Sequence, residues 1–181
     1  GFGEQWLMQS GYRSWRTAIG DVVEAGRWLV GQGIADPAKL TIAGWSYGGY
    51  AALQAQAIDP ALFKAVVAIA PVTDFADRMR RSQYYSNYLI EQQRMGTGME
   101  AEEASPSSHA AQFRAPVLMF HGTADRNVDI TQAKIMQGKL EGAGKRSRLV
   151  IYDGLAHGLN DSDARADMLQ QSADFLLAAG K

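Results

Sequence analysis

The 181-residue chain contains no cysteine, which excludes disulfide bonds, thiolate metal sites and a cysteine nucleophile and leaves the redox compartment open. The chain also lacks any basic block or stripe, and its formal net charge is only −1, so nucleic acid is not an expected partner. No apolar run approaches the roughly 18 residues that a membrane helix requires, and we therefore expect no membrane segment.

The remaining composition is that of an ordinary globular protein, with 46% hydrophobic and 20% charged residues. Its length predicts one domain over residues 1–181. We find no metal-ligand set, phosphate loop or dinucleotide fingerprint, since Gly96-Thr97-Gly98 lacks the strand–turn–helix setting such a loop needs. We therefore expect no metal and no cofactor.

Short apolar runs alternate with stretches whose apolar residues recur at helical spacing. The runs predict strands at 40–44, 65–70, 116–120 and 148–152, and the helical stretches lie at 12–30, 47–58, 130–140 and after Ser162, which we expect to cap the last helix. Residues 72–115 form a longer, less regular region. This alternation predicts a parallel sheet with helices on its faces and right-handed crossovers.

A glycine-rich turn lies between the first predicted strand and the next helix, with the sequence Gly44-Trp45-Ser46-Tyr47-Gly48-Gly49-Tyr50. A Gly-x-Ser-x-Gly pattern between a strand and a helix is typical of a nucleophile elbow. The turn is so sharp that we expect a Cβ at Gly44 or Gly48 to collide with the backbone on the other side of the turn. We also expect Ser46 to have strained backbone angles. Ser46 is therefore the candidate nucleophile.

A serine hydroxyl needs a base, and the chain offers three histidines. His157 follows the last predicted strand and precedes Gly158, a position that suits the base. His121 directly follows a strand and suits a packed structural histidine, whereas His109 lies in a loop rich in Ser, Pro and Ala and is expected to be solvated.

The base in turn needs an orienting carboxylate. Asp125 follows the strand at 116–120, and the carboxyl ends of parallel strands gather functional groups at one edge of a sheet. Asp129 and Asp153 compete with it, although Asp129 suits a cap for the helix at 130 and Asp153 opens the turn before His157. The order Ser, Asp, His is that of the α/β-hydrolases.

Several blocks of sequence together resemble the catalytic domain of the prolyl oligopeptidase family (S9) of serine peptidases, especially its dipeptidyl-peptidase and acylaminoacyl-peptidase branches. The resemblance covers nearly the whole chain. It rests on Gly1-Phe2-Gly3, Asp36-Pro37, the motif around Ser46, Ala70-Pro71-Val72-Thr73-Asp74, Ser105-Pro106, Pro116-Val117-Leu118, His121-Gly122-Thr123-Ala124-Asp125 and His157-Gly158.

The resemblance implies an α/β-hydrolase fold and a triad of Ser46, Asp125 and His157. It also implies that the backbone N–H of Tyr47 is an oxyanion donor. Asn127 resembles an asparagine that holds the substrate backbone in the dipeptidyl-peptidase branch, although an asparagine there can also simply fix the loop.

Three tyrosines in the irregular region, Tyr84, Tyr85 and Tyr88, resemble tyrosines that line the pocket for the residue before the scissile bond. The stretch Met79-Arg80-Arg81-Ser82-Gln83 departs from the pattern of those relatives. A surface helix with packed tyrosines is the alternative interpretation.

Members of the family carry an upstream β-propeller, further N-terminal strands and a second oxyanion donor, which have no counterpart in this sequence. We expect residues 1–181 to be the C-terminal portion of a longer peptidase, weakly active alone because losing one oxyanion donor costs about 10²–10³ in rate. The strand at 40–44 would then have an open edge, which favours pairing with another chain or a homo-oligomer.

The resulting hypothesis is a serine peptidase that hydrolyses short peptides through an acyl-enzyme on Ser46. A carboxylesterase using the same triad is the first alternative. A catalytically silent module that assembles through the open sheet edge is the second. The sequence shows no targeting segment, and the compartment, cytoplasmic or periplasmic, stays open.

Overall fold

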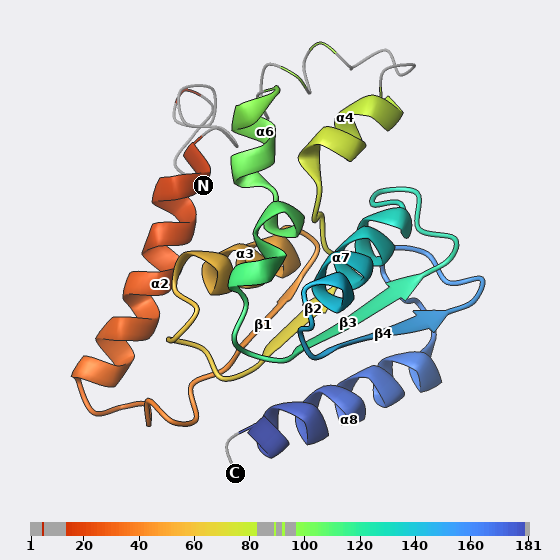
Figure 1. Ribbon diagram of the computed structural model, residues 1–181. Coiled ribbons are helices and arrows are strands. Elements are labelled where there is room, and N and C mark those ends of the chain that lie inside the picture. Colours follow the sequence, from red (N-terminus) through yellow and green to blue (C-terminus); the bar gives the residue numbers. More distant parts are fainter. Residues whose placement is uncertain (1–4, 6–13, 83–88, 90–91, 93–96, 180–181) are drawn as a thin grey trace.

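The computed structural model of the chain describes residues 5, 14–82, 89, 92 and 97–179 (Figure 1). The elements follow one another in an alternating α/β order: α2 (Trp15–Gly31), β1 (Ile42–Trp45), α3 (Tyr47–Ile58), β2 (Val66–Ile69), α4 (Phe75–Ser82), α6 (Met99–Ala104), the 3₁₀-helix η2 (Pro106–Gln112), β3 (Val117–Gly122), α7 (Thr131–Gly142), β4 (Ser147–Tyr152) and α8 (Ser162–Ala179).

The strands form one parallel sheet in the order β1-β2-β3-β4. The register places Gly44 beside Ala68, and Ala68 beside Met119 of β3. Helices lie on both sides of the sheet, with α3 and α7 on one side and α8 on the other (Figure 1). The predicted parallel sheet flanked by helices is therefore confirmed.

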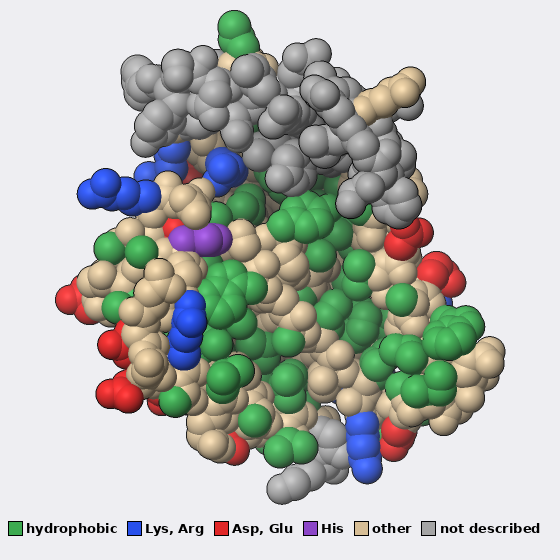
Figure 2. Space-filling view, turned by 180° about the vertical axis from the view of Figure 1, so that it is seen from behind, with side chains coloured by type: hydrophobic (Ala, Val, Ile, Leu, Met, Phe, Trp, Pro, Cys, Tyr) green, Lys and Arg blue, Asp and Glu red, His purple; other side chains and the backbone are tan. Residues whose placement is uncertain are grey.

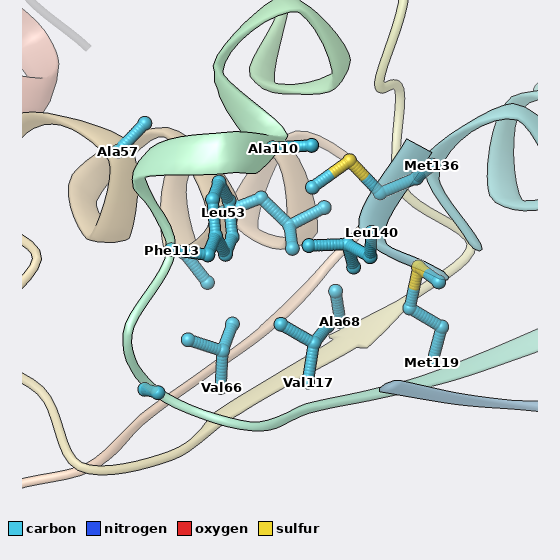
Figure 3. Packing of buried hydrophobic residues seen from close by; sticks show 12 residues of the cluster. Leu53, Ala57, Val66, Ala68, Ala110, Phe113, Val117, Met119, Met136 and Leu140 are labelled. Atoms are coloured by element: carbon cyan, nitrogen blue, oxygen red, sulfur yellow. The ribbon is translucent and has the colours of Figure 1, made fainter. Parts of the chain in front are cut away.

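Successive side chains of β2 and β3 point to opposite faces, and both faces are covered, so these strands are buried at every position. One face packs against α3, η2 and α7 (Figure 3), through the cluster of Leu53, Val66, Ala68, Phe113, Val117, Met119, Met136 and Leu140. The other face packs against α8, through Val67, Ile69, Leu118, Phe120, Leu159 and Met168.

Helix α2 packs against α3 through a stripe of apolar residues with helical spacing. Trp15, Ile19 and Val23 are buried along this stripe and share a cluster with Tyr50 of α3. Phe75 and Met79 of α4 extend the same cluster. The helix that follows Ser46 is thereby held between the sheet and α2.

Two sequence-based expectations about local structure need correction. The region 72–115 holds α4, α6 and η2 in its described part, so it is more regular than expected. The cap of α8 is Asp161 rather than Ser162, because the Asp161 carboxylate accepts a hydrogen bond from the Ala164 N–H at 2.8 Å while Ser162 is already the first helical residue.

Strand β1 lies at one edge of the sheet and, within the described ranges, pairs only with β2. The N–H groups of Ile42 and Ser46 donate to the carbonyl oxygens of Ala65 and Ile69 on the β2 side. The N–H groups of the intervening Ala43 and Trp45 therefore point away from the sheet. This agrees with the predicted open edge.

Seen from behind, hydrophobic side chains are visible over much of the surface (Figure 2). No helix in the described residues is long and apolar enough to cross a membrane.

Candidate active site

Ser46 lies in a sharp turn between β1 and α3, with a φ of 56° and a ψ of −115°. This backbone conformation is strained for a residue with a side chain. The turn is held by a hydrogen bond from the Ser46 N–H to the Ile69 carbonyl oxygen at 2.8 Å. The predicted strained turn at Ser46 is therefore present.

The glycines around Ser46 meet different surroundings. A Cβ on Gly44 would lie 2.0 Å from the Gly48 carbonyl oxygen, as the sharp turn predicts. A Cβ on Gly48 would meet nothing within 4 Å, so the expected collision at Gly48 is wrong. Gly49 is the second tight position, because a Cβ there would lie 3.1 Å from the Ile69 carbonyl oxygen.

The structure brings Ser46, Asp125 and His157 together from the ends of β1, β3 and β4. His157 Nε2 lies 3.0 Å from Ser46 Oγ, and His157 Nδ1 lies 2.7 Å from Asp125 Oδ2. Since an ionised carboxylate only accepts hydrogen bonds, the neutral imidazole carries its proton on Nδ1 and offers Nε2 to the serine hydroxyl. This geometry suits removal of the hydroxyl proton during nucleophilic attack.

The Asp125 carboxylate is completely buried and is held by its own loop. Its Oδ1 accepts hydrogen bonds from the N–H groups of Asn127 at 2.9 Å and Val128 at 3.0 Å. The competing aspartates lie elsewhere: Asp129 accepts from the Thr131 N–H at the start of α7, and Asp153 accepts from the Thr123 hydroxyl. The contact with Thr131 lowers the pKa of Asp129 below its usual value.

His121 is buried and hydrogen-bonded, as the sequence predicted for a structural histidine. Its Nε2 lies 2.8 Å from the Val128 carbonyl oxygen and 3.2 Å from Asp125 Oδ2, a contact that the sequence did not indicate. Burial lowers the pKa of His121, and the nearby carboxylate of Asp125 opposes that shift. A neutral His121 with its proton on Nε2 therefore contacts the Oδ2 atom of Asp125.

His109 departs from its expected solvated state. It is half-buried, and its Nε2 lies 2.8 Å from the Glu103 carbonyl oxygen. This ring holds the junction of α6 and η2 together and does not contact Ser46, Asp125 or His157.

Two close approaches hold the His157 loop against the ends of β1 and β3. The Trp45 indole N–H donates to the His157 carbonyl oxygen at 3.2 Å. A Cβ on Gly122 would lie 2.1 Å from the Leu155 carbonyl oxygen, so only glycine permits this loop to pack against β3. Trp45 was not recognised as a site residue, although it occupies a variable position of the Gly-x-Ser-x-Gly motif.

A cleft of about 190 Å³ opens beside Ser46. Its described lining comprises Ser46, Tyr47, Tyr50, Val72, Phe75, Arg78, Asn127, Val128 and His157. The predicted substrate-binding residue Asn127 is thus at the cleft, whereas Tyr84, Tyr85 and Tyr88 lie outside the described residues. In the described part of the chain, no group of three or more His, Cys, Asp or Glu residues is arranged to hold a metal ion.

Tyr47 is the first residue of α3, so its backbone N–H lies at the N-terminal end of that helix. Its side chain is 42% exposed, and its ring lies 5.5 Å from that of Tyr50. The positive end of the α3 dipole is therefore adjacent to Ser46.

Known proteins are similar to this chain in sequence and in fold. Dipeptidyl peptidase 4 of Bos taurus is 28% identical over 165 residues, which cover 87% of this chain and 20% of that protein. The crystal structure of Porphyromonas gingivalis dipeptidyl peptidase 4 matches with a TM-score of 0.82 and 26% identity, over 97% of this chain and 24% of that chain. The propionate-bound esterase Est2 of the Planctomycetes species Thermogutta terrifontis matches with a TM-score of 0.70 and 26% identity, over 90% of this chain and 65% of that chain.

These matches confirm the predicted α/β-hydrolase fold and the family resemblance. The chain spans about a fifth of the length of the bovine relative. A model of the prolyl oligopeptidase family matches residues 1–181. The chain therefore belongs to the prolyl oligopeptidase family.

Proposed function

We propose that this chain carries the catalytic centre of a serine peptidase that hydrolyses short peptides. The observation that carries the proposal is the position of His157, with Ser46 Oγ at 3.0 Å on one side and Asp125 Oδ2 at 2.7 Å on the other. Short peptides are the substrates that the family resemblance implies. The names of the relatives, which include dipeptidyl peptidases, support peptide hydrolysis.

In the proposed reaction, Ser46 Oγ attacks the scissile carbonyl carbon while His157 Nε2 takes its proton. Asp125 holds the imidazole in the required tautomer and stabilises the imidazolium. The tetrahedral intermediate collapses as the C–N bond breaks and His157 protonates the leaving amine. Water then attacks the acyl-enzyme by the same route, and its proton passes through His157 back to Ser46.

Two further groups have proposed roles in this reaction. The Tyr47 N–H, at the start of α3, would donate to the oxyanion that forms on the scissile carbonyl. Asn127 is exposed at the cleft, while its backbone N–H already serves Asp125 and its carbonyl oxygen accepts from Arg78 at 3.1 Å. Since the backbone of Asn127 fixes the loop, we assign its side-chain amide to the substrate backbone.

Ester hydrolysis is a second candidate, because the Thermogutta terrifontis esterase shares the fold at 26% identity and this chain covers 65% of it. An acyl-enzyme mechanism serves both bond types. Comparing kcat/KM for an aminoacyl p-nitroanilide and a short-chain p-nitrophenyl ester at matched concentrations separates them. Measurable anilide turnover supports the peptidase, whereas turnover of the ester alone supports the esterase.

A third candidate, a silent assembly module, is favoured by one observation, the open edge of β1. It differs from the two enzymes in requiring no activated serine. Labelling of the 181-residue chain with a fluorophosphonate probe therefore separates the silent module from both enzymes, because the probe reports activated serines regardless of substrate.

We expect the wild-type chain to be labelled, and Ser46→Ala and His157→Ala to lose the label. Matched controls are Ser162→Ala on the exposed start of α8 and His109→Ala on η2, which are expected to keep it. A wild type that is folded by circular dichroism but unlabelled would contradict an autonomous catalytic centre in this chain.

A further inference from the structure

We propose that the cleft beside Ser46 selects a substrate with an acidic side chain, Glu or Asp, immediately before the scissile bond. This inference rests on the proposed peptidase function and extends it to a substrate class. Three features of the cleft carry it: apolar walls, one arginine, and a buried hydroxyl without a partner.

The walls of the cleft are apolar near Ser46. Val72 follows β2, Phe75 begins α4, and Val128 follows the Asp125 loop. Phe75 and Val128 are buried at 4% exposure each. Such walls suit the methylene groups of a substrate side chain rather than its polar end.

Arg78 supplies a positive charge at the wall of the cleft. It lies one helical turn after Phe75, so both side chains share one face of α4. Its Nη1 donates to the Asn127 carbonyl oxygen at 3.1 Å, which ties the guanidinium to the loop that also carries Asp125. Among the described lining residues no carboxylate is present, and Arg78 is the one with a permanent charge.

The two aspartates near Arg78 in sequence are engaged by other groups. Asp77 accepts hydrogen bonds from Arg81 at 2.7 Å and from the buried Gln132 amide at 3.1 Å. Asp74 accepts from the Asp77 N–H at 2.7 Å and from the Ser107 hydroxyl at 3.1 Å. These contacts fix both carboxylates within the scaffold behind the cleft.

Tyr50 supplies a polar group to the same wall of the cleft as Phe75 and Arg78. It is 1% exposed, and its hydroxyl is buried without a hydrogen-bond partner. Its ring packs edge-on against Phe75 with 5.1 Å between the ring centroids. Burial raises the pKa of the phenol, so the hydroxyl keeps its proton as a donor. An unpaired buried donor is costly, and an acceptor brought by the substrate would satisfy it.

The cleft wall is preorganised by a buried glutamine. Gln132 Oε1 accepts hydrogen bonds from the N–H groups of Thr73 at 2.9 Å and Asp74 at 2.8 Å. The Thr73 hydroxyl donates back to the Gln132 carbonyl oxygen. The segment between β2 and α4, which positions Val72, Phe75 and Arg78, is thereby tied to α7.

A glutamate or aspartate side chain matches these features in order. Its methylene groups would contact Val72 and Phe75, and its carboxylate would accept from Arg78 and from the Tyr50 hydroxyl. Hydrogen bonds between a guanidinium and a carboxylate are among the stronger ones in proteins. We expect discrimination of about 10- to 100-fold between Glu and its neutral isostere Gln.

The test compares the p-nitroanilides of Ala-Glu and Ala-Gln, which differ only in the charge of the critical side chain. For the wild-type 181-residue chain we expect kcat/KM to be at least about tenfold higher with Glu. Arg78→Met is expected to abolish the preference, Arg78→Lys to retain part of it, and Tyr50→Phe to reduce it. Because each enzyme supplies its own ratio, a general loss of activity does not affect the comparison.

The matched control is Arg80→Met. Arg80 lies on the same helix but pairs with Asp77 at 3.3 Å and does not line the cleft. We expect its Glu-to-Gln ratio to equal that of the wild type. A wild-type ratio near one, or the same ratio in Arg78→Met as in the wild type, would overturn the proposal.

A binding measurement separates this proposal from the proposed chemistry. Calorimetry with the Ser46→Ala chain compares acetyl-Ala-Glu-amide with acetyl-Ala-Gln-amide, which present no terminal charge. Tighter binding of the Glu peptide that Arg78→Met removes supports the acidic-residue cleft even if the chain hydrolyses nothing. Equal binding of the two peptides contradicts it even if the fluorophosphonate labels Ser46.

Discussion

At the residue scale, identical glycines in one motif carry different constraints. Gly44 permits the β1 backbone to pass the α3 backbone, since its missing Cβ would overlap the Gly48 carbonyl oxygen. Gly48 itself faces open space and lies within α3, where glycine is a poor helix former. Replacing each glycine by alanine therefore shows whether its position has no room for a side chain.

We expect Gly44→Ala to lower the free energy of unfolding by about 3 kcal/mol or more, because backbone atoms on both sides must move. Gly48→Ala is the matched control and should leave that free energy unchanged or raise it by up to about 1 kcal/mol. Urea denaturation monitored by circular dichroism measures both. A similar loss of unfolding free energy in the two variants would show that a Cβ at position 48 also collides with neighbouring atoms.

The second prediction concerns His121, whose pKa burial lowers in the folded state. The unfolded chain takes up a proton near the usual pKa of about 6.5, whereas the folded chain does so only at lower pH. Stability contributed by neutral His121 is therefore complete above that value and is lost as the pH falls below it, by up to about 1.4 kcal/mol per pH unit.

The measurement is the free energy of unfolding at pH 7.5 and at successively lower pH, for wild type and His121→Gln. The glutamine amide retains a donor for the Val128 carbonyl oxygen without titrating. We expect a smaller decline with falling pH in His121→Gln. Parallel curves for the two proteins would contradict the lowered pKa.

At the element scale, helix α8 depends on one residue outside its own span. Asp161 caps the helix through the Ala164 N–H and also places a negative charge at the positive end of the dipole. Helix α8 covers one face of β2 and β3 through Met168 and its neighbours. Fraying of its first turn would therefore loosen the cover of that face.

We expect Asp161→Ala to lower the free energy of unfolding by about 1 kcal/mol and Asp161→Asn to lower it by less, because asparagine also caps. The neighbouring Ser162→Ala should change it by no more than about 0.5 kcal/mol. Thermal and urea unfolding check the series. A larger effect at Ser162 than at Asp161 would restore the sequence-based assignment of the cap.

At the scale of the whole molecule, the sheet ends at β1 in the described part of the chain. The outward N–H groups of Ala43 and Trp45 and the exposure of Ala43 make this strand a template for another strand. We propose that a second copy of the chain pairs there. The domain boundaries and the whole protein's activity stay proposals, since the chain spans only 20% of its bovine relative.

The corresponding prediction is concentration-dependent self-association of the 181-residue chain in sedimentation equilibrium. Ala43→Pro should weaken it, because proline removes an outward N–H while leaving the bonds between β1 and β2 intact. Ala43→Thr keeps that N–H and serves as the control. Equal average masses for wild type and Ala43→Pro at every concentration would count against pairing at this edge.

Local patterns in the sequence were sufficient for the main architecture and for the candidate triad. Alternating strand and helix periods predicted the parallel sheet, because hydrophobic spacing reflects which faces are buried. The carboxyl ends of three predicted strands identified Ser46, Asp125 and His157, because parallel strands bring those ends to one edge. Their roles stay proposals, and the roles of Tyr84, Tyr85 and Tyr88 stay predictions.

Other features were decided only by tertiary structure. Trp45 bonds to a carbonyl 112 positions away, and His121 turns toward Asp125 rather than merely filling the core. The open space at Gly48 and the unpaired hydroxyl of Tyr50 likewise depend on what packs nearby. Such contacts arise between loops and helices distant in sequence, and no periodicity of the chain encodes their relative placement. The sequence by itself determined the elements and the order of the reactive side chains, whereas packing decided which groups support those side chains and what the cleft beside them presents.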